Sequence, residues 1–141
     1  MSFGQAIAHV FLNYDTFTRR ASRSEFWWWI LFAAIGTVVT YYLPLPFGFR
    51  LGGGVLVLGS GAAAQVILIP VVPMLTVIWF LIITIPTLAV GTRRLHDANK
   101  KGWWWLLALV CGIGPLVLIV LWVLPGTKGR NRFGAGPALG Y

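Results

Sequence analysis

The sequence predicts an all-α fold, a polytopic bundle of transmembrane helices with a short amphipathic helix at its N-terminal end. Three observations predict it. Of the 141 residues, 58% are hydrophobic and 10% are charged, whereas a soluble domain carries about 25% charged residues. Lys and Arg gather in clusters that are separated by long uncharged stretches. Two Trp triplets stand at the start of apolar runs that are long enough to cross a bilayer.

The basic charge fits a membrane protein better than a nucleic-acid-binding protein. The net charge is +8, but the Lys and Arg clusters flank apolar segments, which is typical of helix ends at a membrane surface. We therefore expect no nucleic-acid partner. Residues 1–25 are too polar to hold the apolar core of a signal peptide, so the first apolar run is expected to remain as a membrane anchor.

Residues 1–25 are expected to form an amphipathic helix followed by a basic lead-in. The apolar residues that recur at helical spacing are Phe3, Ile7, Val10, Phe11 and Tyr14. Ser2 precedes them as the expected N-cap. Such a helix either lies among lipid headgroups or packs on the protein's own helices, and the sequence leaves both open.

The first span is expected at residues 26–43, directly after the basic lead-in. Its length corresponds to about 27 Å of helix, close to the ~30 Å thickness of the hydrocarbon core. Pro44 and Pro46 are expected to end it. Tryptophan favours the membrane interface, because its ring is apolar and its N–H needs a partner. The expected interface anchors are Trp27, Trp28, Trp103 and Trp104.

Residues 51–92 carry no charge and are too long for one span, since a single helix would measure about 63 Å. In one interpretation residues 44–65 form a Gly- and Pro-rich connector or part-span, and residues 66–92 form the second span. In the other, two spans over about 51–69 and 73–91 meet at a pair of prolines.

The last span is expected at residues 103–124, after a basic loop over residues 93–102. The segment Gly112–Pro115 lies in its middle and predicts a kink or a break. Residues 125–141 are expected to form a basic and mostly irregular tail.

The distribution of Lys and Arg favours three spans over four, because these residues concentrate on the cytoplasmic side. With a cytoplasmic N-terminus, three spans place seven of them inside and four outside, and four spans place six and five. A third arrangement, in which the last segment dips into the membrane and returns at Gly112–Pro115, places ten inside and one outside. Each arm would then have only about half the length of a span. We expect three spans, and the side of the C-terminus stays open.

Three segments resemble one family of bacterial inner-membrane proteins, catalogued as domain of unknown function 805. The first segment is residues 14–28, which contain Arg20-Ala-Ser-Arg-Ser-Glu-Phe-Trp27. The second contains Ile85-Pro-Thr-Leu-Ala-Val90, Arg93-Arg-Leu-His-Asp97 and Gly102-Trp-Trp104. The third is Pro125–Gly134. Together they cover nearly the whole chain. The chain departs from the family pattern at Arg19, where glycine is frequent, at Lys101 and at Gly136. The resemblance implies a small multi-pass protein of the bacterial inner membrane and implies no biochemical activity.

The densest polar group comprises Arg93, Arg94, His96 and Asp97. In a functional interpretation it binds an anionic group such as a lipid phosphate, because arginine can bind phosphate through two parallel hydrogen bonds. His96 and Asp97 would then orient the arginines. In a structural interpretation Asp97 pairs with an arginine or caps the loop, and the cluster only sets the topology.

A second polar group comprises Arg20, Arg23 and Glu25. The only carboxylates of the chain are those of Asp15, Glu25 and Asp97. We expect Glu25 to pair with an arginine of the 93–101 loop, and Asp97 to pair with Arg20 or Arg23, so that ion pairs join the two groups. Asn131 and Phe133 of the tail either dock on the helices or belong to a loose basic tail.

The sequence contains no recognisable catalytic, metal-binding or cofactor-binding motif, so we expect neither an enzyme nor a cofactor. No ionisable residue lies in the middle of an expected span, which argues against a pathway for charged substrates through one chain. We expect a membrane component that interacts with lipids, including anionic headgroups, with other membrane proteins or with further copies of itself. The alternative is a subunit of a small oligomeric channel or transporter.

Overall fold

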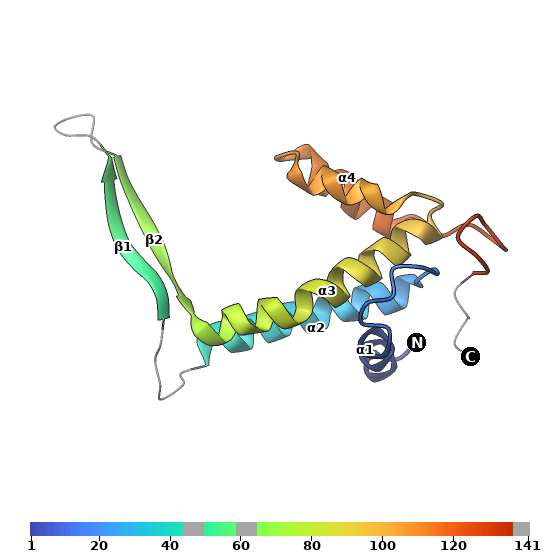
Figure 1. Ribbon diagram of the computed structural model, residues 1–141, viewed down its shortest axis with the longest axis horizontal. Coiled ribbons are helices and arrows are strands. Elements are labelled where there is room, and N and C mark those ends of the chain that lie inside the picture. Colours follow the sequence, from blue (N-terminus) through green and yellow to red (C-terminus); the bar gives the residue numbers. More distant parts are fainter. Residues whose placement is uncertain (44–49, 59–64, 137–141) are drawn as a thin grey trace. The chain divides into compact units, whose positions relative to one another are not determined.

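The computed structural model describes residues 1–43, 50–58 and 65–136 (Figure 1). These residues are mostly helical. In chain order the elements are α1 (Phe3–Leu12), α2 (Arg23–Tyr42), β1 (Arg50–Leu58), β2 (Gln65–Pro73), α3 (Met74–Asp97), the 3-10 helix η2 (Gly102–Leu109) and α4 (Ile113–Val123). They form two compact units: unit 1 comprises Met1–Ala33 and Ile83–Tyr141, and unit 2 comprises Ala34–Ile82.

Unit 2 contains a two-stranded antiparallel sheet, so the predicted all-α fold is wrong in this segment. β1 and β2 pair in a register that places Leu58 opposite Gln65. Periodicity cannot separate a short apolar strand from a buried helix. Here the valines and isoleucines favour strands, and three glycines in β1 disfavour a helix. The connector predicted over 44–65 is therefore partly a strand, and its residues 44–49 and 59–64 lie outside the described residues.

The second long helix differs from both predicted arrangements. β2 extends to Pro73 and α3 begins at Met74. The predicted span over 66–92 therefore starts too early, and the predicted pair of spans over 51–69 and 73–91 places a helix where β1 and β2 lie. α3 is the one helix among the described residues that is long and apolar enough to cross a membrane. Only 33% of its most apolar window is buried, so most of that window is exposed in the part of the chain that the structure describes.

The C-terminal end of α3 corrects the predicted loop over 93–102. Arg93–Asp97 forms the last turns of the helix, which ends beyond Asp97 in a Schellman motif. Asn99 adopts the left-handed conformation with φ 58°, and the backbone N–H of Lys100 donates to the carbonyl of Leu95 at 2.8 Å. Asparagine tolerates this conformation better than most residues, so the sequence does contain the stop signal.

In unit 1, α1 packs on α2, which answers the question left open for the amphipathic helix. Ala6 and Val10 are fully buried. The ring of Phe11 meets that of Trp29 edge to face, with 5.3 Å between the centroids. Trp29 in turn donates from Nε1 to Oγ1 of Thr87 on α3 at 3.0 Å. The N-terminal helix is therefore attached to the helical core.

Residues 103–124, predicted as one span with a kink or a break at Gly112–Pro115, form two short helices, η2 and α4, that pack on each other. Gly112 separates them with φ 79°, a left-handed conformation that suits glycine. A Cβ at Gly114 would overlap the carbonyl of Leu107, so the close approach of the two helices requires a glycine there. With 11 residues, α4 measures about 16 Å, half a bilayer.

A small hydrophobic core fixes this hairpin of helices to α3. Leu95 of α3 packs with Leu118 and Leu121 of α4. Trp105 of η2 contributes its ring to the same cluster and donates from Nε1 to Oγ1 of Thr92 at 3.1 Å. The residues that follow α4 consequently return to the C-terminal end of α3.

Candidate functional site

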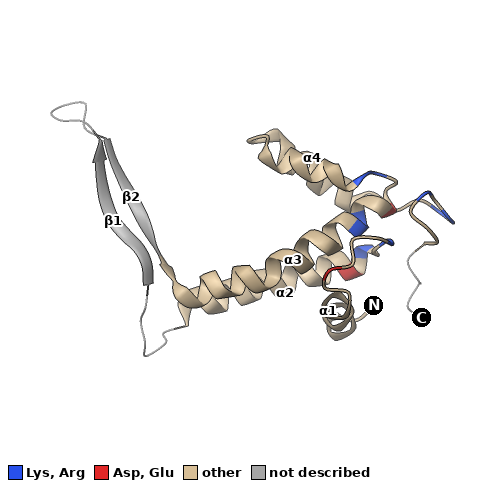
Figure 2. Ribbon diagram, in the orientation of Figure 1, with Lys and Arg blue, Asp and Glu red and all other residues tan. Residues whose placement is uncertain are grey.

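The charged residues gather at one end of unit 1, where the N-terminus of α2 and the C-terminal ends of α3 and α4 meet (Figure 2). Five of the charged side chains there are almost completely buried, with at most 5% of their residue surface exposed: Arg20, Glu25, Arg93, Arg94 and Asp97. Ionised groups are rarely buried without partners. The geometry of this cluster therefore has to provide a partner for each charge.

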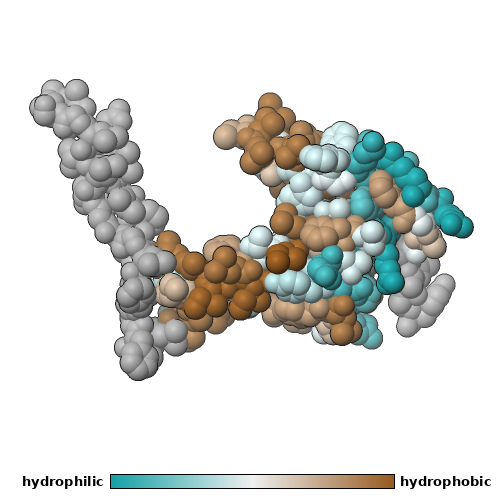
Figure 3. Space-filling model, in the orientation of Figure 1, coloured by the Kyte–Doolittle hydropathy of each residue, from teal (hydrophilic) through white to brown (hydrophobic). Residues whose placement is uncertain are grey.

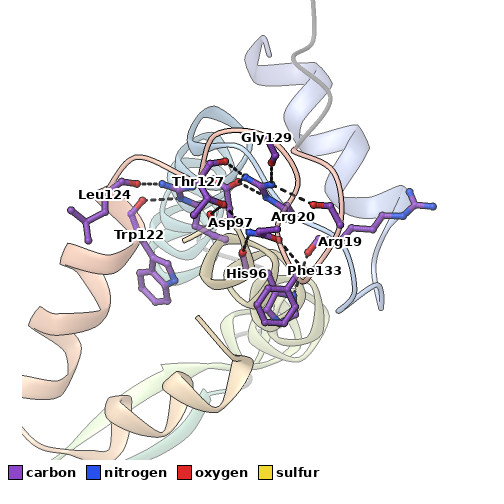
Figure 4. Close-up of polar contacts among 12 residues, drawn as sticks. Arg19, Arg20, His96, Asp97, Trp122, Leu124, Thr127, Gly129 and Phe133 are labelled. Atoms are coloured by element: carbon purple, nitrogen blue, oxygen red, sulfur yellow. Dashed lines mark hydrogen bonds and ion pairs between the residues drawn. The ribbon is translucent and has the colours of Figure 1, made fainter. Parts of the chain in front are cut away.

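Asp97 lies between two arginines from different segments (Figure 4). Its Oδ1 accepts from Nε of Arg20 at 2.9 Å and lies 2.7 Å from Nη2 of the same guanidinium. Its Oδ2 accepts from Nη1 of Arg94. One carboxylate thus holds the lead-in to α2 against the last turn of α3.

Backbone carbonyls of the C-terminal segment satisfy the remaining donors of these two arginines (Figure 4). Arg20 donates from Nη1 to the carbonyl of Gly129 at 2.6 Å and from Nη2 to that of Thr127. Arg94 donates from Nε to the carbonyl of Trp122 at 2.9 Å and from Nη2 to that of Leu124. The last carbonyls of a helix lack partners within the helix and carry its negative dipole end, so Arg94 is an effective C-cap for α4.

The second carboxylate, Glu25, joins three segments in the same way. Its Oε1 lies 2.8 Å from Nη1 of Arg93 and 3.0 Å from Nδ1 of His9 on α1. The backbone N–H of Glu25 donates to Oγ of Ser22 at 3.1 Å, so Ser22 caps α2. A carboxylate in the first turn also suits the positive end of the helix dipole. The expected pairs between the two polar groups are both present, Glu25 with Arg93 and Asp97 with Arg20.

The tail docks on the end of α3 and is not loose. The ring of Phe133 stacks on that of His96 at 3.9 Å, and Asn131 donates from Nδ2 to the carbonyl of His96 at 2.9 Å. The backbone N–H of Thr127 donates to the carbonyl of Asp97 at 2.9 Å. His96 therefore supports the tail, instead of orienting the arginines as the functional interpretation of the sequence requires.

Several predicted residues lie at the surface. Arg23 is exposed and makes no ion pair with the residues that the structure describes. The expected interface anchors Trp27, Trp28, Trp103 and Trp104 are between 36% and 75% exposed. Sequence reasoning missed His9 and Ser22 as partners of Glu25. The spacing Ser22-x-x-Glu25, typical of a helix N-terminus, was the available signal.

Arg19, where the resemblance leads us to expect glycine, has φ 78°. The left-handed region costs a residue with a side chain about 1–2 kcal/mol, and glycine adopts it readily. The carbonyl of Arg19 accepts a hydrogen bond from Nδ1 of His96 at 3.3 Å. The turn that aims Arg20 into the cluster therefore uses a conformation suited to glycine.

Comparison with known proteins identifies the family. The profile of the family described as "Protein of unknown function (DUF805)" matches residues 14–135. Inner membrane protein YhaH of Escherichia coli K12 is 38% identical over 130 residues, covering 92% of this chain and 93% of its own. Inner membrane protein YhaI of the same strain is 34% identical over 131 residues, covering 93% of each chain. No solved structure matches. The chain therefore belongs to the DUF805 family and, like these relatives, is an inner membrane protein.

Proposed function

We propose that this chain is a multi-pass protein of the bacterial inner membrane that binds anionic lipid at its charged end. The observation that carries the proposal is a groove of about 490 Å³ along the start of α2. Arg23 and Ser24 line one part of it, and Trp27, Leu31 and Val123 line the apolar part. A basic group beside an aromatic and aliphatic surface complements a lipid, whose phosphate and acyl chain have the same order.

The apolar surface around this groove supports the lipid environment. On α4 the exposed side chains are large and hydrophobic: Ile113, Leu116, Ile119, Val120 and Val123 are between 45% and 72% exposed. In the space-filling view α4 is hydrophobic and the charged end is hydrophilic (Figure 3). Contiguous apolar surface of this kind is rare on soluble monomers and normal for surface in contact with lipid.

The proposed topology has two crossing helices, α3 and α2, and a C-terminal hairpin of η2 and α4 that enters and leaves on the same side. We include α2 on its length of 20 residues, although only α3 among the described helices combines the length and the hydropathy of a span. The hydrogen bonds of Arg94 to the C-terminal end of α4 support a tail on the side of the Arg93–Asp97 turns. Ten of the eleven Lys and Arg residues then lie together, and the positive-inside rule makes that side cytoplasmic. A fluorescent protein fused to the C-terminus should be fluorescent, and alkaline phosphatase fused there should be inactive. The opposite pair of results would exclude this topology.

The lipid proposal is tested by comparing Arg23→Gln with Arg130→Gln, an exposed arginine of the tail. Purified protein in nanodiscs with and without phosphatidylglycerol is titrated with brominated lipids, which quench nearby tryptophans such as Trp27. We expect quenching by brominated phosphatidylglycerol at lower mole fractions than by brominated phosphatidylcholine, and we expect Arg23→Gln alone to remove that preference. Equal quenching by both lipids in the wild-type protein would contradict the proposal. Selective ion or solute flux through liposomes would favour the channel or transporter instead.

A further inference from the structure

A second pocket adjoins the groove at Arg23. Its volume is about 630 Å³, and pockets that bind small molecules usually measure about 300–1,000 Å³. The two hollows share Arg23 and Ser24 in their walls, so they meet at the start of α2. The groove continues from there over apolar side chains, whereas the second pocket continues over polar ones. We call this second hollow the polar pocket; its other polar lining residues are Arg20, Ser22, Asp97, Thr127 and Lys128.

The polar pocket carries more positive charge than its wall neutralises. Asp97 is the one carboxylate that lines it, and the guanidinium groups of Arg20 and Arg94 both pair with Asp97. Arg23 and Lys128 are exposed and make no ion pair with the residues that the structure describes. Two exposed cations beside one pocket create a positive potential that attracts anions. The pocket is therefore suited to a ligand with more than one negative charge.

The polar pocket also has a hydroxyl hydrogen to donate. The Oγ atoms of Ser22 and Ser24 lie 3.1 Å apart and share one hydrogen bond. Two hydroxyl groups hold two hydrogens, so one O–H has no acceptor among the described residues. The guanidinium of Arg20, by contrast, is occupied by Asp97 and by carbonyls of the tail (Figure 4). A ligand in this pocket would therefore meet one serine hydroxyl and the two unpaired cations.

We propose that the groove and the polar pocket together bind a lipid whose headgroup carries two negative charges, with an acyl chain along the groove. Arg23 lines both hollows and Lys128 lines the polar pocket, so each charge of the headgroup has its own cation. A singly charged headgroup would leave Lys128 without a counter-charge. Phosphatidic acid carries both charges on one phosphate, and cardiolipin carries one charge on each of two phosphates. The inference rests on the proposed function, because it names the headgroup that the lipid site at Arg23 prefers.

The test uses the purified full chain in nanodiscs at about pH 9, above the second pKa of a phosphomonoester. Brominated phosphatidylglycerol, phosphatidic acid and cardiolipin are compared at equal total lipid charge, and quenching of tryptophan fluorescence is measured. We expect a doubly charged lipid to reach half-maximal quenching at about fivefold lower lipid charge than phosphatidylglycerol. This is the factor that one Lys or Arg contributes beside an anionic surface.

Lys128→Gln is the decisive variant, because it removes the cation that meets the second charge. We expect the fivefold ratio between phosphatidylglycerol and the doubly charged lipid to fall to about one. Arg130→Gln is the matched control: it removes one positive charge from an exposed position of the same tail, outside both hollows. The ratio should stay fivefold in this control. Lys128 is exposed as well, so neither exchange disturbs buried packing.

The outcomes separate this inference from the proposed function. A preference for phosphatidylglycerol over phosphatidylcholine, without a further preference for either doubly charged lipid, would overturn the inference and leave the proposed function standing. Equal ratios in Lys128→Gln and Arg130→Gln would have the same meaning. Equal quenching by all four lipids would overturn both. A preference for phosphatidic acid alone would place the two charges on one phosphate, and a preference for cardiolipin alone would place them on two.

Discussion

The carboxylate of Asp97 forms ion pairs with two buried arginines, Arg20 and Arg94, so Asp97→Asn tests the structural role of the cluster directly. The substitution keeps the size of the side chain and removes its charge. An asparagine has one acceptor oxygen, and its amide N–H₂ would point at one of the two guanidinium groups. Arg20 and Arg94 would then face each other without a counter-charge.

The expected loss follows from the burial of the three side chains. The side chains of Arg20 and Arg94 are 1% and 0% exposed and that of Asp97 is 6% exposed, so solvent screens their interaction little. Removing one partner of a buried ion pair costs about 3–5 kcal/mol. At the lower figure, the population of molecules with a released tail should rise about 100-fold, since each 1.4 kcal/mol is a factor of ten.

Limited trypsin digestion of the detergent-solubilised chain measures this population, because the tail contains Lys128, Arg130 and Arg132. When opening and closing are faster than cleavage, the cleavage rate follows the population of the open form. We expect faster cleavage in the tail of Asp97→Asn, followed by mass spectrometry. Asp15→Asn is the matched control, since Asp15 is exposed and makes no ion pair with the described residues. Cleavage of both variants within twofold of the wild-type rate would refute the reasoning.

Three further substitutions probe the same end of the molecule. Gly126→Ala places a Cβ on the carboxylate of Asp97, and the displacement should cost about 1–3 kcal/mol and speed tryptic cleavage of the tail. Arg19→Gly removes the strain of a side chain in the left-handed conformation and should stabilise the protein by about 0.5–1 kcal/mol. The thermal midpoint in detergent should rise, and a lower midpoint would contradict the left-handed conformation of residue 19. The exchange Glu25→Arg with Arg93→Glu should restore most of the stability that either single change removes, and a double variant no more stable than the singles would show that the pair is not coupled.

The sequence predicted the polar contacts better than the path of the chain. With only three carboxylates available, Glu25 and Asp97 had few alternatives, and the structure contains both expected pairs. The choice of Arg93 over Arg94 for Glu25 could not be predicted, because it depends on which face of α3 each side chain occupies. That face is fixed only once Arg93–Asp97 is known to be helical.

The apolar segments were harder to interpret, because hydrophobicity alone does not distinguish their conformations. The strands at 50–58 and 65–73 are apolar except for Arg50 and Gln65 at their first positions, so no alternation of polar and apolar residues identifies them as strands. At 103–124 the break at Gly112 was visible, and a segment that returns there was one of the arrangements considered, but its short arms counted against it. A kinked span and a hairpin of two short helices differ in the packing of Gly114 on Leu107, which local sequence does not specify.

The hydrogen bonds of Arg94 provide the physical argument for the hairpin. If residues 103–124 crossed the membrane, the carbonyls of Trp122 and Leu124 would lie about 30 Å from the end of α3. Arg94, fully buried, would lose two of its acceptors, and a buried donor left unpaired costs about 1–3 kcal/mol. The last carbonyls of α4 would lose their cap as well. The 11 residues of α4 are too few to cross a bilayer, and Arg94 provides the partners that the carbonyls at the C-terminal end of α4 lack.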